Sequence, residues 1–252
     1  MLIEKISPYK LYITTMKSKL VDKIIHTESG NLFFILQNKG MVYSFLNPVS
    51  YLDALKHKKL YCELDGVFAD GSILVAAIMM CYGVKVGRYS FDMTSLAPKL
   101  LEYACKCGKS VYIVASAQDQ VEKAVKIFQE RYRGINIIGY RNGFFSNEME
   151  KDGEARHIAE VNPDFLIVGM GAIIQEEFLL KVKKAGFNGI GFTCGGFIHQ
   201  TAKNLINYYP AWIDRMNLRF VYRFIHEPHT RMRYIKAGFF FPIRFIWERI
   251  FG

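Results

Sequence analysis

The stretch DFLIVGMGAIIQEEFLLKVKKAG, residues 164–186, decides the fold class of this chain. It opens with a short apolar run of the kind found in buried strands. A turn containing Gly169 and Gly171 follows, and apolar residues then recur at helical spacing until Gly186 ends the pattern. A strand, a glycine turn and a helix in this order predict one unit of an α/β fold.

The same alternation extends along most of the chain. Asn47 is an expected helix N-cap, with Pro48 at the first helical position. We therefore predict an α/β, Rossmann-like fold with a largely parallel sheet flanked by helices, and a basic helical appendage at the C-terminal end. Strands are expected at residues 31–36, 41–46, 110–116, 135–140, 164–171 and 189–194, and helices at 47–60, 118–134 and 173–186.

The composition indicates a folded protein in a reducing compartment. The 252 residues are 51% apolar and 15% aromatic, which suffices for one large core with a small appendage. The five cysteines form no CxxC pair and are expected to be reduced thiols. Residues 1–12 lack the apolar segment of a signal peptide, and the longest apolar run, residues 73–84, is too short to span a bilayer and predicts a buried helix. These features predict a cytoplasmic protein.

Positive charge is concentrated towards the C-terminal end. The formal net charge of +10 favours a polyanionic partner, namely nucleic acid, an anionic membrane surface or a phosphorylated substrate. Residues 211–252 carry eight basic and three acidic side chains, a net charge of +5, and no strand-turn-helix alternation. We therefore expect an α/β domain at 1–210 and a basic aromatic, membrane-proximal appendage at 211–252.

Aromatic side chains are interleaved with the cations of this appendage. They suit the interface of an anionic membrane, where aromatics lie at headgroup depth and cations meet lipid phosphates. Packing against the main domain explains them equally well from the sequence. The aromatics are Phe239, Phe240, Phe241, Phe245, Trp247 and Phe251, beside Arg244 and Arg249.

Loops that follow strands are the first candidates for a site, because open parallel sheets bind ligands at the carboxyl ends of their strands. Asn47 follows the strand at 41–46, where its amide suits a ligand, although capping is the simpler explanation. Asp70 lies in the loop FADGS before a helix, where it suits an N-cap or a general base. From the residues alone, capping is again favoured.

Two glycine turns are further candidates. Gly169 and Gly171 precede a helix start, where backbone N–H groups can receive a diphosphate. Ile174 occupies the third glycine position of a dinucleotide motif, which weakens an NAD interpretation. The second turn, CGGFIHQ at residues 194–200, allows close backbone approach and contains a histidine and a glutamine that suit a ligand, although a lone histidine is more often structural.

Six motifs, in this order, resemble the WecG/TagA/CpsF family of glycosyltransferases, which make bacterial surface polysaccharides and teichoic acid linkage units. The resemblance covers roughly residues 40–235, and the order of six motifs is more specific than any one of them. The motifs are FLNP, FADGS, RNGFF, NPDFLIVGMGAIIQEEF, CGG and LRFVYRFIHEPHTRMRY.

The resemblance implies inverting, metal-independent transfer of a sugar from a UDP-sugar to an acceptor sugar on polyprenyl diphosphate, with no cofactor. It places the family's proposed base on Asp70, which would take the proton of the acceptor hydroxyl. Glycine turns and appendage arginines would stabilise the charge on departing UDP. The implied substrate-binding residues are Asn47, Gly71, Gly143, Gly169, Gly171, Gln175, Glu176, Gly195, Gly196, Arg223, Arg231 and Arg233, with no metal ligands.

The chain departs from the family pattern at several of these motifs. Phe45 replaces a threonine, Ala69 replaces a proline, and Ile173 and Ile174 replace Pro-Lys. The missing hydroxyl and lysine remove two polar groups from the expected site. After CGGF the chain reads IHQTAKNLINYYPAW, where the family has an aspartate and glycine leading to Arg-Ala-Pro, and this difference indicates a divergent subgroup with a different sugar pocket.

The resulting prediction is a hexosyl- or N-acetylhexosaminyltransferase at the inner face of the bacterial cell membrane. Its expected partners are a UDP-sugar, a polyprenyl-diphosphate-linked acceptor and an anionic membrane surface, and a homo-oligomer is compatible with the sequence. A catalytically silent membrane-docking scaffold of the same pathway is the main alternative, because the departures at Phe45, Ile173 and Ile174 would explain lost activity. A nucleic-acid-binding protein has only the basic tail in its favour, so no nucleic acid is expected, and an oxidoreductase lacks its third glycine.

Overall fold

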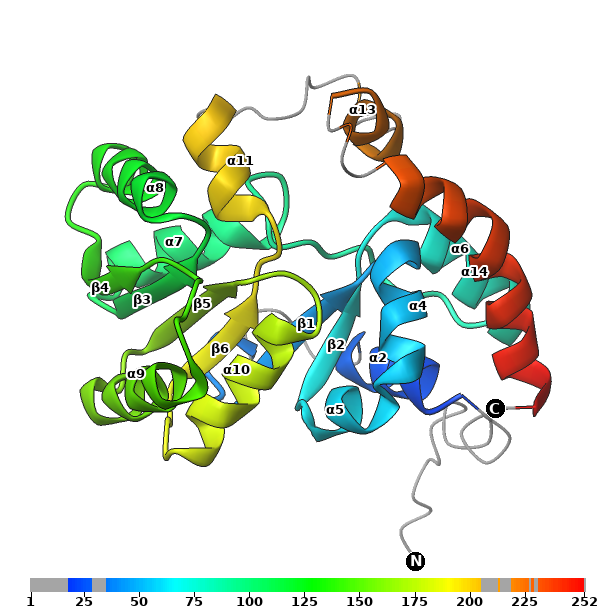
Figure 1. Cartoon of the computed structure of the whole chain (residues 1–252), viewed down its shortest axis with the longest axis horizontal. Helices are drawn as coiled ribbons and strands as arrows, with labels where there is room; N and C mark the ends of the chain where they lie inside the picture. Colours follow the sequence, from blue (N-terminus) through cyan, green and yellow to red (C-terminus); the bar gives the residue numbers. More distant parts are fainter. Residues whose placement is uncertain are drawn as a thin grey trace, which may run out of the picture.

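The computed structural model describes residues 18–28, 35–204, 213, 219–226, 228 and 231–251 (Figure 1). Within them, six strands form one sheet in the order β2-β1-β6-β5-β3-β4, and every neighbouring pair is parallel. The strands are β1 (Val42–Leu46), β2 (Gly66–Ala69), β3 (Ser110–Ala115), β4 (Asn136–Arg141), β5 (Phe165–Gly169) and β6 (Ile190–Thr193). The predicted α/β, Rossmann-like fold is confirmed.

Helices cover both faces of this sheet. Side chains alternate between the faces along each strand, so Val42 and Leu46 of β1 enter one apolar cluster and Tyr43 the other. The first cluster is completed by α2 (Lys19–Glu28), α4 (Pro48–Lys56), α5 (Lys58–Glu63), α6 (Ser72–Tyr82), α9 (Glu148–Val161), α10 (Ile174–Lys184) and α14 (Arg231–Phe251). The second is completed by α7 (Leu96–Lys106), α8 (Gln118–Arg131) and α11 (Phe197–Asn204), and α13 (Arg219–His226) precedes α14.

One strand prediction is wrong, and one strand of the sheet was not predicted. The strand expected at 31–36 is wrong for Ile35 and Leu36, which lie in a helical turn, and its first four residues are outside the described part of the chain. The sequence analysis also missed β2, which is only four residues long. Its edge is covered by α2, where the Thr27 hydroxyl accepts a hydrogen bond from the backbone N–H of Val67 (2.8 Å).

The helices expected at 118–134 and 173–186 are present as α8 and α10, whereas the helix expected at 47–60 divides at His57 into α4 and α5. Asn47 caps α4, because its Oδ1 accepts hydrogen bonds from the backbone N–H groups of Val49 (3.0 Å) and Ser50 (3.1 Å). The run at 73–84 does form a helix, α6, but only one side is buried. Ile73, Met79 and Met80 are exposed, so the prediction of a buried helix is wrong for that face.

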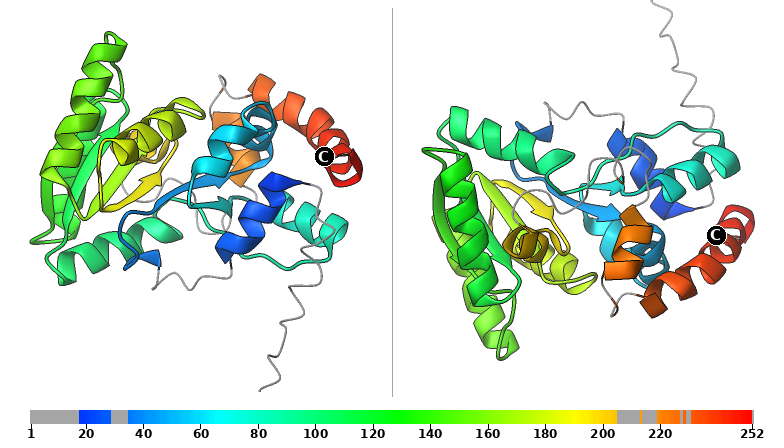
Figure 2. Two further views of the ribbon diagram at one scale, coloured as in Figure 1. Left: turned by 90° about the horizontal axis from the view of Figure 1, so that it is seen from below. Right: turned by 90° about the horizontal axis from the view of Figure 1, so that it is seen from above.

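The C-terminal helix α14 packs on α4 and α6 at the end of the molecule opposite α8 and α9 (Figures 1 and 2). Phe241 and Phe245 are buried there, and the Tyr51 ring lies 5.6 and 5.3 Å from their respective centroids. Lys58 of α5 bonds Glu248 of α14 (2.6 Å). The other four appendage aromatics, Phe239, Phe240, Trp247 and Phe251, are exposed. Packing against the main domain therefore explains Phe241 and Phe245, whereas contact of the exposed aromatics with a membrane stays a prediction.

Candidate functional site

All six strands end at the same edge of the sheet, and this edge gathers most of the predicted site residues. The neighbours β3 and β5 continue in opposite directions, to β4 and to β6, which makes a switch point of the kind where α/β sheets bind ligands. Hydrogen bonds join the strand ends, from Cys194 N to Val168 O (2.7 Å) and from Ser116 N to Gly169 O (3.2 Å). The edge is thus one continuous surface.

Asp70 is the first residue after β2. Its backbone N–H donates to the carbonyl of Leu46 at the end of β1 (2.7 Å), and its side chain is half-buried. The N-cap position of α6 is Gly71, at a φ of 92°, and glycine has no side chain that could cap the helix. Asp70 therefore does not occupy the N-cap position that the sequence favoured for it, and it lies at the edge where the predicted site residues gather.

Asn47 follows β1, the strand next to β2. Its Oδ1 is used by the cap, whereas its Nδ2 makes no hydrogen bond to any described residue. Phe45, which stands where the family pattern has threonine, stacks on Phe68 (ring centroids 5.2 Å apart) and meets Phe91 edge-on. The aromatic ring thus extends the apolar cluster below the edge.

Close packing requires glycine at 169 and leaves little room for a side chain at 143. A Cβ on Gly169 would lie 2.7 Å from the sulfur of Cys194 and 2.8 Å from the carbonyl oxygen of Gly195. A Cβ on Gly143 would lie 3.0 Å from Met170, and the Gly143 N–H donates to the carbonyl of Ser116 (2.9 Å). Both glycines let neighbouring turns approach each other at the carboxyl edge.

The turn from β5 into α10 has an unusual backbone. Gly171 has a φ of 88°, which glycine tolerates, but Ile173 has a φ of 75°, which is strained for a β-branched residue. The proline that the family pattern has at this position cannot adopt a positive φ. The change to isoleucine therefore accompanies a different path of the turn.

Gln175 and Glu176 are buried beneath this turn. Oε1 of Glu176 accepts hydrogen bonds from Ser44 Oγ (2.7 Å) and Gln175 Nε2 (2.9 Å), and Oε2 accepts one from the backbone N–H of Ile173 (2.6 Å). Burial raises the pKa of Glu176, while these hydrogen bonds act in the opposite direction. Oε1 of Gln175 in turn accepts from the backbone N–H of Gly195 (3.2 Å).

The turn after β6 faces the beginning of α8. Gly195 has a φ of 53°, and Gly196 is exposed. His199 of α11 contacts Gln120 of α8 through Nδ1 and Oε1 (3.0 Å). Burial raises the pKa of the Cys194 thiol to about 12, so this thiol is neutral and unsuited to act as a nucleophile at neutral pH.

The predicted arginines lie apart from the glycine turns. Arg231 donates to the carbonyls of Phe224 (2.9 Å) and Ile225 (3.0 Å) in the last turn of α13, and Arg233 pairs with Asp53 of α4 (3.4 Å). Arg223 belongs to α13, but its side chain is outside the described residues. Figure 1 shows α11, α13 and the start of α14 on the side of the sheet where the strands end.

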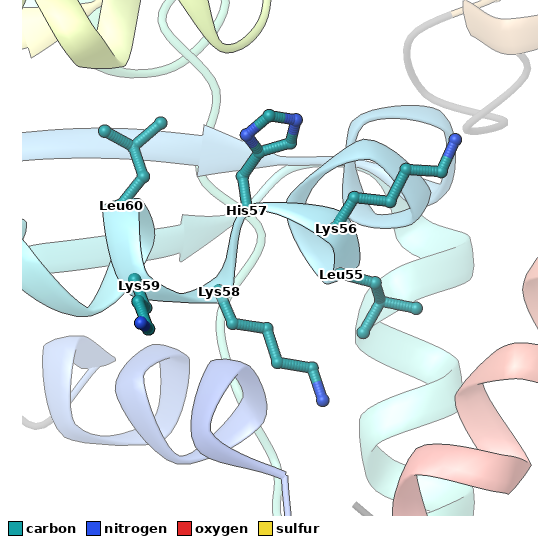
Figure 3. A pocket seen from close by; sticks show the side chains of 6 residues that line it. All are labelled: Leu55, Lys56, His57, Lys58, Lys59 and Leu60. Carbon is teal, nitrogen blue, oxygen red and sulfur yellow. The ribbon is translucent and has the colours of Figure 1, made fainter.

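Two surface hollows contain none of the predicted site residues. One, of about 410 Å³, is lined by Lys126, Gln129, Glu130 and Arg133 of α8 and the residues after it. The other, of about 490 Å³, lies at the corner between α4 and α5, where Lys56 and Lys58 point in different directions (Figure 3). No group of three or more His, Cys, Asp or Glu side chains in the described ranges is arranged to hold a metal ion.

Comparison with known proteins agrees with this architecture. The sequence pattern of the glycosyl transferase WecG/TagA/CpsF family matches residues 21–252. The chain belongs to this family. It is therefore a glycosyltransferase of polysaccharide biosynthesis, as the motif order predicted.

Relatives in this family are similar over most of their length. A UDP-Gal:alpha-D-GlcNAc-diphosphoundecaprenol beta-1,4-galactosyltransferase from Shigella boydii is 33% identical over 218 residues, 86% of this chain and 91% of the relative. An N-acetylglucosaminyldiphosphoundecaprenol N-acetyl-beta-D-mannosaminyltransferase from Bacillus subtilis (strain 168) is 26% identical, over 77% and 75% of the two chains. A protein of the same name from Staphylococcus aureus (strain NCTC 8325 / PS 47) is 22% identical, over 77% and 72%.

The structure also adds polar residues that the sequence analysis missed. Ser44 of β1 and Thr193 of β6 are buried, and Thr193 Oγ1 donates to Ser44 Oγ (3.0 Å). Ser44 in turn bonds Glu176, so the chain of hydrogen bonds runs from β6 through β1 to α10. The signal in the sequence was a lone serine inside the apolar run VYSFL, which predicts an inward polar contact of a buried strand.

Proposed function

We propose that this glycosyltransferase moves a sugar from a UDP-sugar to a sugar carried on polyprenyl diphosphate, with inversion at the anomeric carbon. The relatives from Shigella boydii and Bacillus subtilis carry diphosphoundecaprenol-linked acceptors in their names. The observation that carries the proposal for this chain is the position of Asp70. Its carboxyl group follows β2 directly, beside Asn47 and at the same edge as the glycine turns.

A single displacement accounts for the inversion. The names of both relatives specify β-linked products, and UDP-galactose, the donor named for the Shigella boydii relative, carries its sugar in α linkage. In the proposed step the acceptor oxygen attacks the anomeric carbon, the bond from this carbon to the diphosphate oxygen breaks, and Asp70 takes the acceptor proton. One general base is sufficient for such a step.

The dimensions of the edge suit an extended donor. Asp70 on β2 and Gly171 after β5 are three strands apart, which corresponds to ~15 Å at the usual strand spacing. We propose that the sugar lies near Asp70 and Asn47 and that the diphosphate lies toward the glycine turns, whereas Gln175, which is buried with both amide atoms bonded inside the fold, does not contact the sugar. Backbone N–H groups there are proposed to stabilise the charge on departing UDP without a metal ion. The arginines of α13 and α14, which lie apart from these turns, are proposed to meet the acceptor diphosphate.

A membrane-facing surface on α14 supports a lipid-linked acceptor. Opposite its buried stripe, α14 carries an exposed apolar stripe at the helical spacing of four, three and four residues, formed by Phe239, Ile243, Ile246 and Ile250. Lys236 and Arg244 flank this stripe, whereas Glu248, the acid of this helix, faces inward to Lys58. We propose that this outer stripe of α14 docks on an anionic bilayer at the inner face of the bacterial membrane.

This docking would be peripheral. Within the described ranges, no helix is both long enough and apolar enough to cross a membrane. On the proposed surface, the apolar side chains enter the headgroup region while the cations meet lipid phosphates. The acceptor diphosphate is then brought to the side of the molecule where α13 and α14 meet.

The test is acceptor-dependent release of UDP from a panel of UDP-sugars, starting with UDP-galactose and a GlcNAc-diphospholipid acceptor. Asp70→Asn is expected to lower turnover by about 10²–10⁴-fold, since it removes the base. The control is Asp65→Asn at the other end of β2, where Asp65 holds the backbone N–H of Val42 (2.7 Å). This variant is expected to lose stability but to keep turnover per folded molecule.

The outcomes separate the proposal from its rivals. Turnover that survives a chelator and collapses only in Asp70→Asn supports the proposed chemistry. Equal turnover by Asp70→Asn and the wild type would show that Asp70 is not the general base. A folded wild-type protein that turns over no donor but binds anionic vesicles would instead favour the scaffold.

A further inference from the structure

We infer that Glu176 is a positioning residue for donor binding rather than a direct substrate contact. Its side chain is 1% exposed, and its two carboxylate oxygens are occupied within the fold. The inference rests on the proposed UDP-sugar donor, because it assigns Glu176 the task of holding the two turns that meet that donor. These are the β5–α10 turn and the β6–α11 turn.

The first of these turns depends on Glu176 through Ile173. The positive φ of Ile173 is unfavourable for a β-branched side chain and persists only if neighbouring contacts hold it. Oε2 of Glu176 supplies such a contact, since it accepts a 2.6 Å hydrogen bond from the Ile173 N–H.

The second turn depends on Glu176 through the amide of Gln175. The carboxylate of Glu176 is an acceptor and therefore requires the NH₂ group of Gln175 to face it. The Gly195 N–H is a donor and requires the amide oxygen. Both neighbours select the same amide orientation, so Glu176 fixes the position of Gln175 and, through it, the backbone N–H of Gly195.

Ser44 links this pair of turns to the sheet. Its hydroxyl donates to Oε1 of Glu176 and accepts from Thr193, so residues of β1, β6 and α10 form one buried chain. Asp70 and Asn47 follow the neighbouring strands β2 and β1. Glu176 is therefore placed to set the donor turns relative to the proposed base while contacting neither substrate itself.

The test compares Glu176→Gln with wild type in full kinetics on whichever UDP-sugar the wild type uses. A glutamine offers one acceptor oxygen in place of two, so at least one of the N–H or O–H donors loses its partner. The KM for the donor is expected to rise about 10- to 100-fold, as a buried donor left without its partner implies, with the acceptor KM unchanged. The enzyme is assayed well below its melting temperature.

A matched control removes a carboxylate of similar bonding from the opposite edge of the sheet. Asp164 accepts hydrogen bonds from the Ser110 N–H (3.0 Å), the Ser110 hydroxyl (3.1 Å) and Lys109 (3.1 Å) where β3 and β5 begin. Asp164→Asn is expected to lower the melting temperature without changing either KM. If the role of Glu176 were purely structural, Glu176→Gln would likewise lower the melting temperature and leave both KM values unchanged.

A milder variant covers the case in which Glu176→Gln does not fold. Ser44→Ala removes one donor and leaves the carboxylate bonded to Ile173 and Gln175, and a several-fold rise in donor KM is expected. An unchanged donor KM in the folded variants would overturn the inference, even if kcat fell. Wild-type protein without turnover on any UDP-sugar would refute the proposed function instead, which keeps the two failures distinct.

Discussion

Replacing Ile243 and Ile246 of α14 by serine is expected to release the protein from anionic vesicles. Both side chains lie on the outer stripe of α14, and they are 54% and 50% exposed. The double variant therefore removes apolar surface that no described part of the protein covers. The core-facing stripe with Phe241 and Phe245 is left unchanged.

The magnitude follows from the exposed halves of these two side chains. Full burial of an isoleucine is worth about 1.5–3 kcal/mol, so each exposed half contributes about 1 kcal/mol on entering the bilayer interface. The pair then contributes about 2 kcal/mol, which corresponds to about a 30-fold decrease in the partition coefficient. Added salt is expected to weaken the binding of the wild-type protein to anionic vesicles, because salt screens the attraction between the cations of α14 and the lipid phosphates.

Co-sedimentation with vesicles of anionic and of neutral lipid measures this partition coefficient. Met149→Ser is the control, because Met149 is 80% exposed on α9, at the opposite end of the molecule (Figure 2). This variant is expected to bind as wild type does. Equal binding of the α14 double variant and wild type, or no preference of wild type for anionic lipid, would refute the membrane-facing role of this stripe.

Three further predictions concern the fold and the site. Gly169→Ala is expected to lower the free energy of unfolding in urea by about 1–3 kcal/mol, because the new Cβ would lie 2.7 Å from the sulfur of Cys194. Gly153→Ala in α9 is the control, since a Cβ there meets no atom within 4 Å, and it is expected to raise the free energy of unfolding by about 0.5–1 kcal/mol. Asn47→Asp keeps the oxygen that caps α4 but removes the amide donor. The melting temperature is expected to stay within about one or two degrees of the wild-type value, as for a neutral surface change, while kcat/KM for the donor falls. Hydrogen bonds from Lys151 and Lys181 lower the pKa of Glu148 to about 2, so its contribution to stability is present above pH 4.5 and is lost as the pH falls to about 2. In urea unfolding, the free energies of unfolding of the wild type and of Glu148→Gln are therefore expected to become equal near pH 2.

Local patterns were sufficient for most elements of the sheet and its helices. The runs at 110–116 and 135–140 predicted β3 and β4, and Asn47 with Pro48 predicted the start of α4. These predictions succeed because strand alternation, helical spacing and capping depend on residues close together in the chain. The short strand β2 was not predicted, because four buried residues carry too little periodicity to identify a strand.

The roles of individual site residues were harder to predict. Capping was the favoured explanation for Asp70, yet the helix begins one residue later and Gly71 takes the N-cap position. Element boundaries shift by a residue or two without any change in the apolar pattern, and such a shift decides whether a side chain caps a helix or faces a ligand. The motif order identified the family, but it gave no account of how Glu176 is bonded.

The sequence by itself determined the α/β class, the glycine turns after the strands, the basic aromatic C-terminal segment and the family. Only the tertiary structure decided that Phe241 and Phe245 are buried while their neighbours on α14 are exposed. It also decided that Glu176 bonds Ser44, 132 residues away, and so joins α10 to β1. The physical reason is that periodicity and capping are local properties of the chain, whereas burial and long-range hydrogen bonds depend on which distant segments the fold brings together.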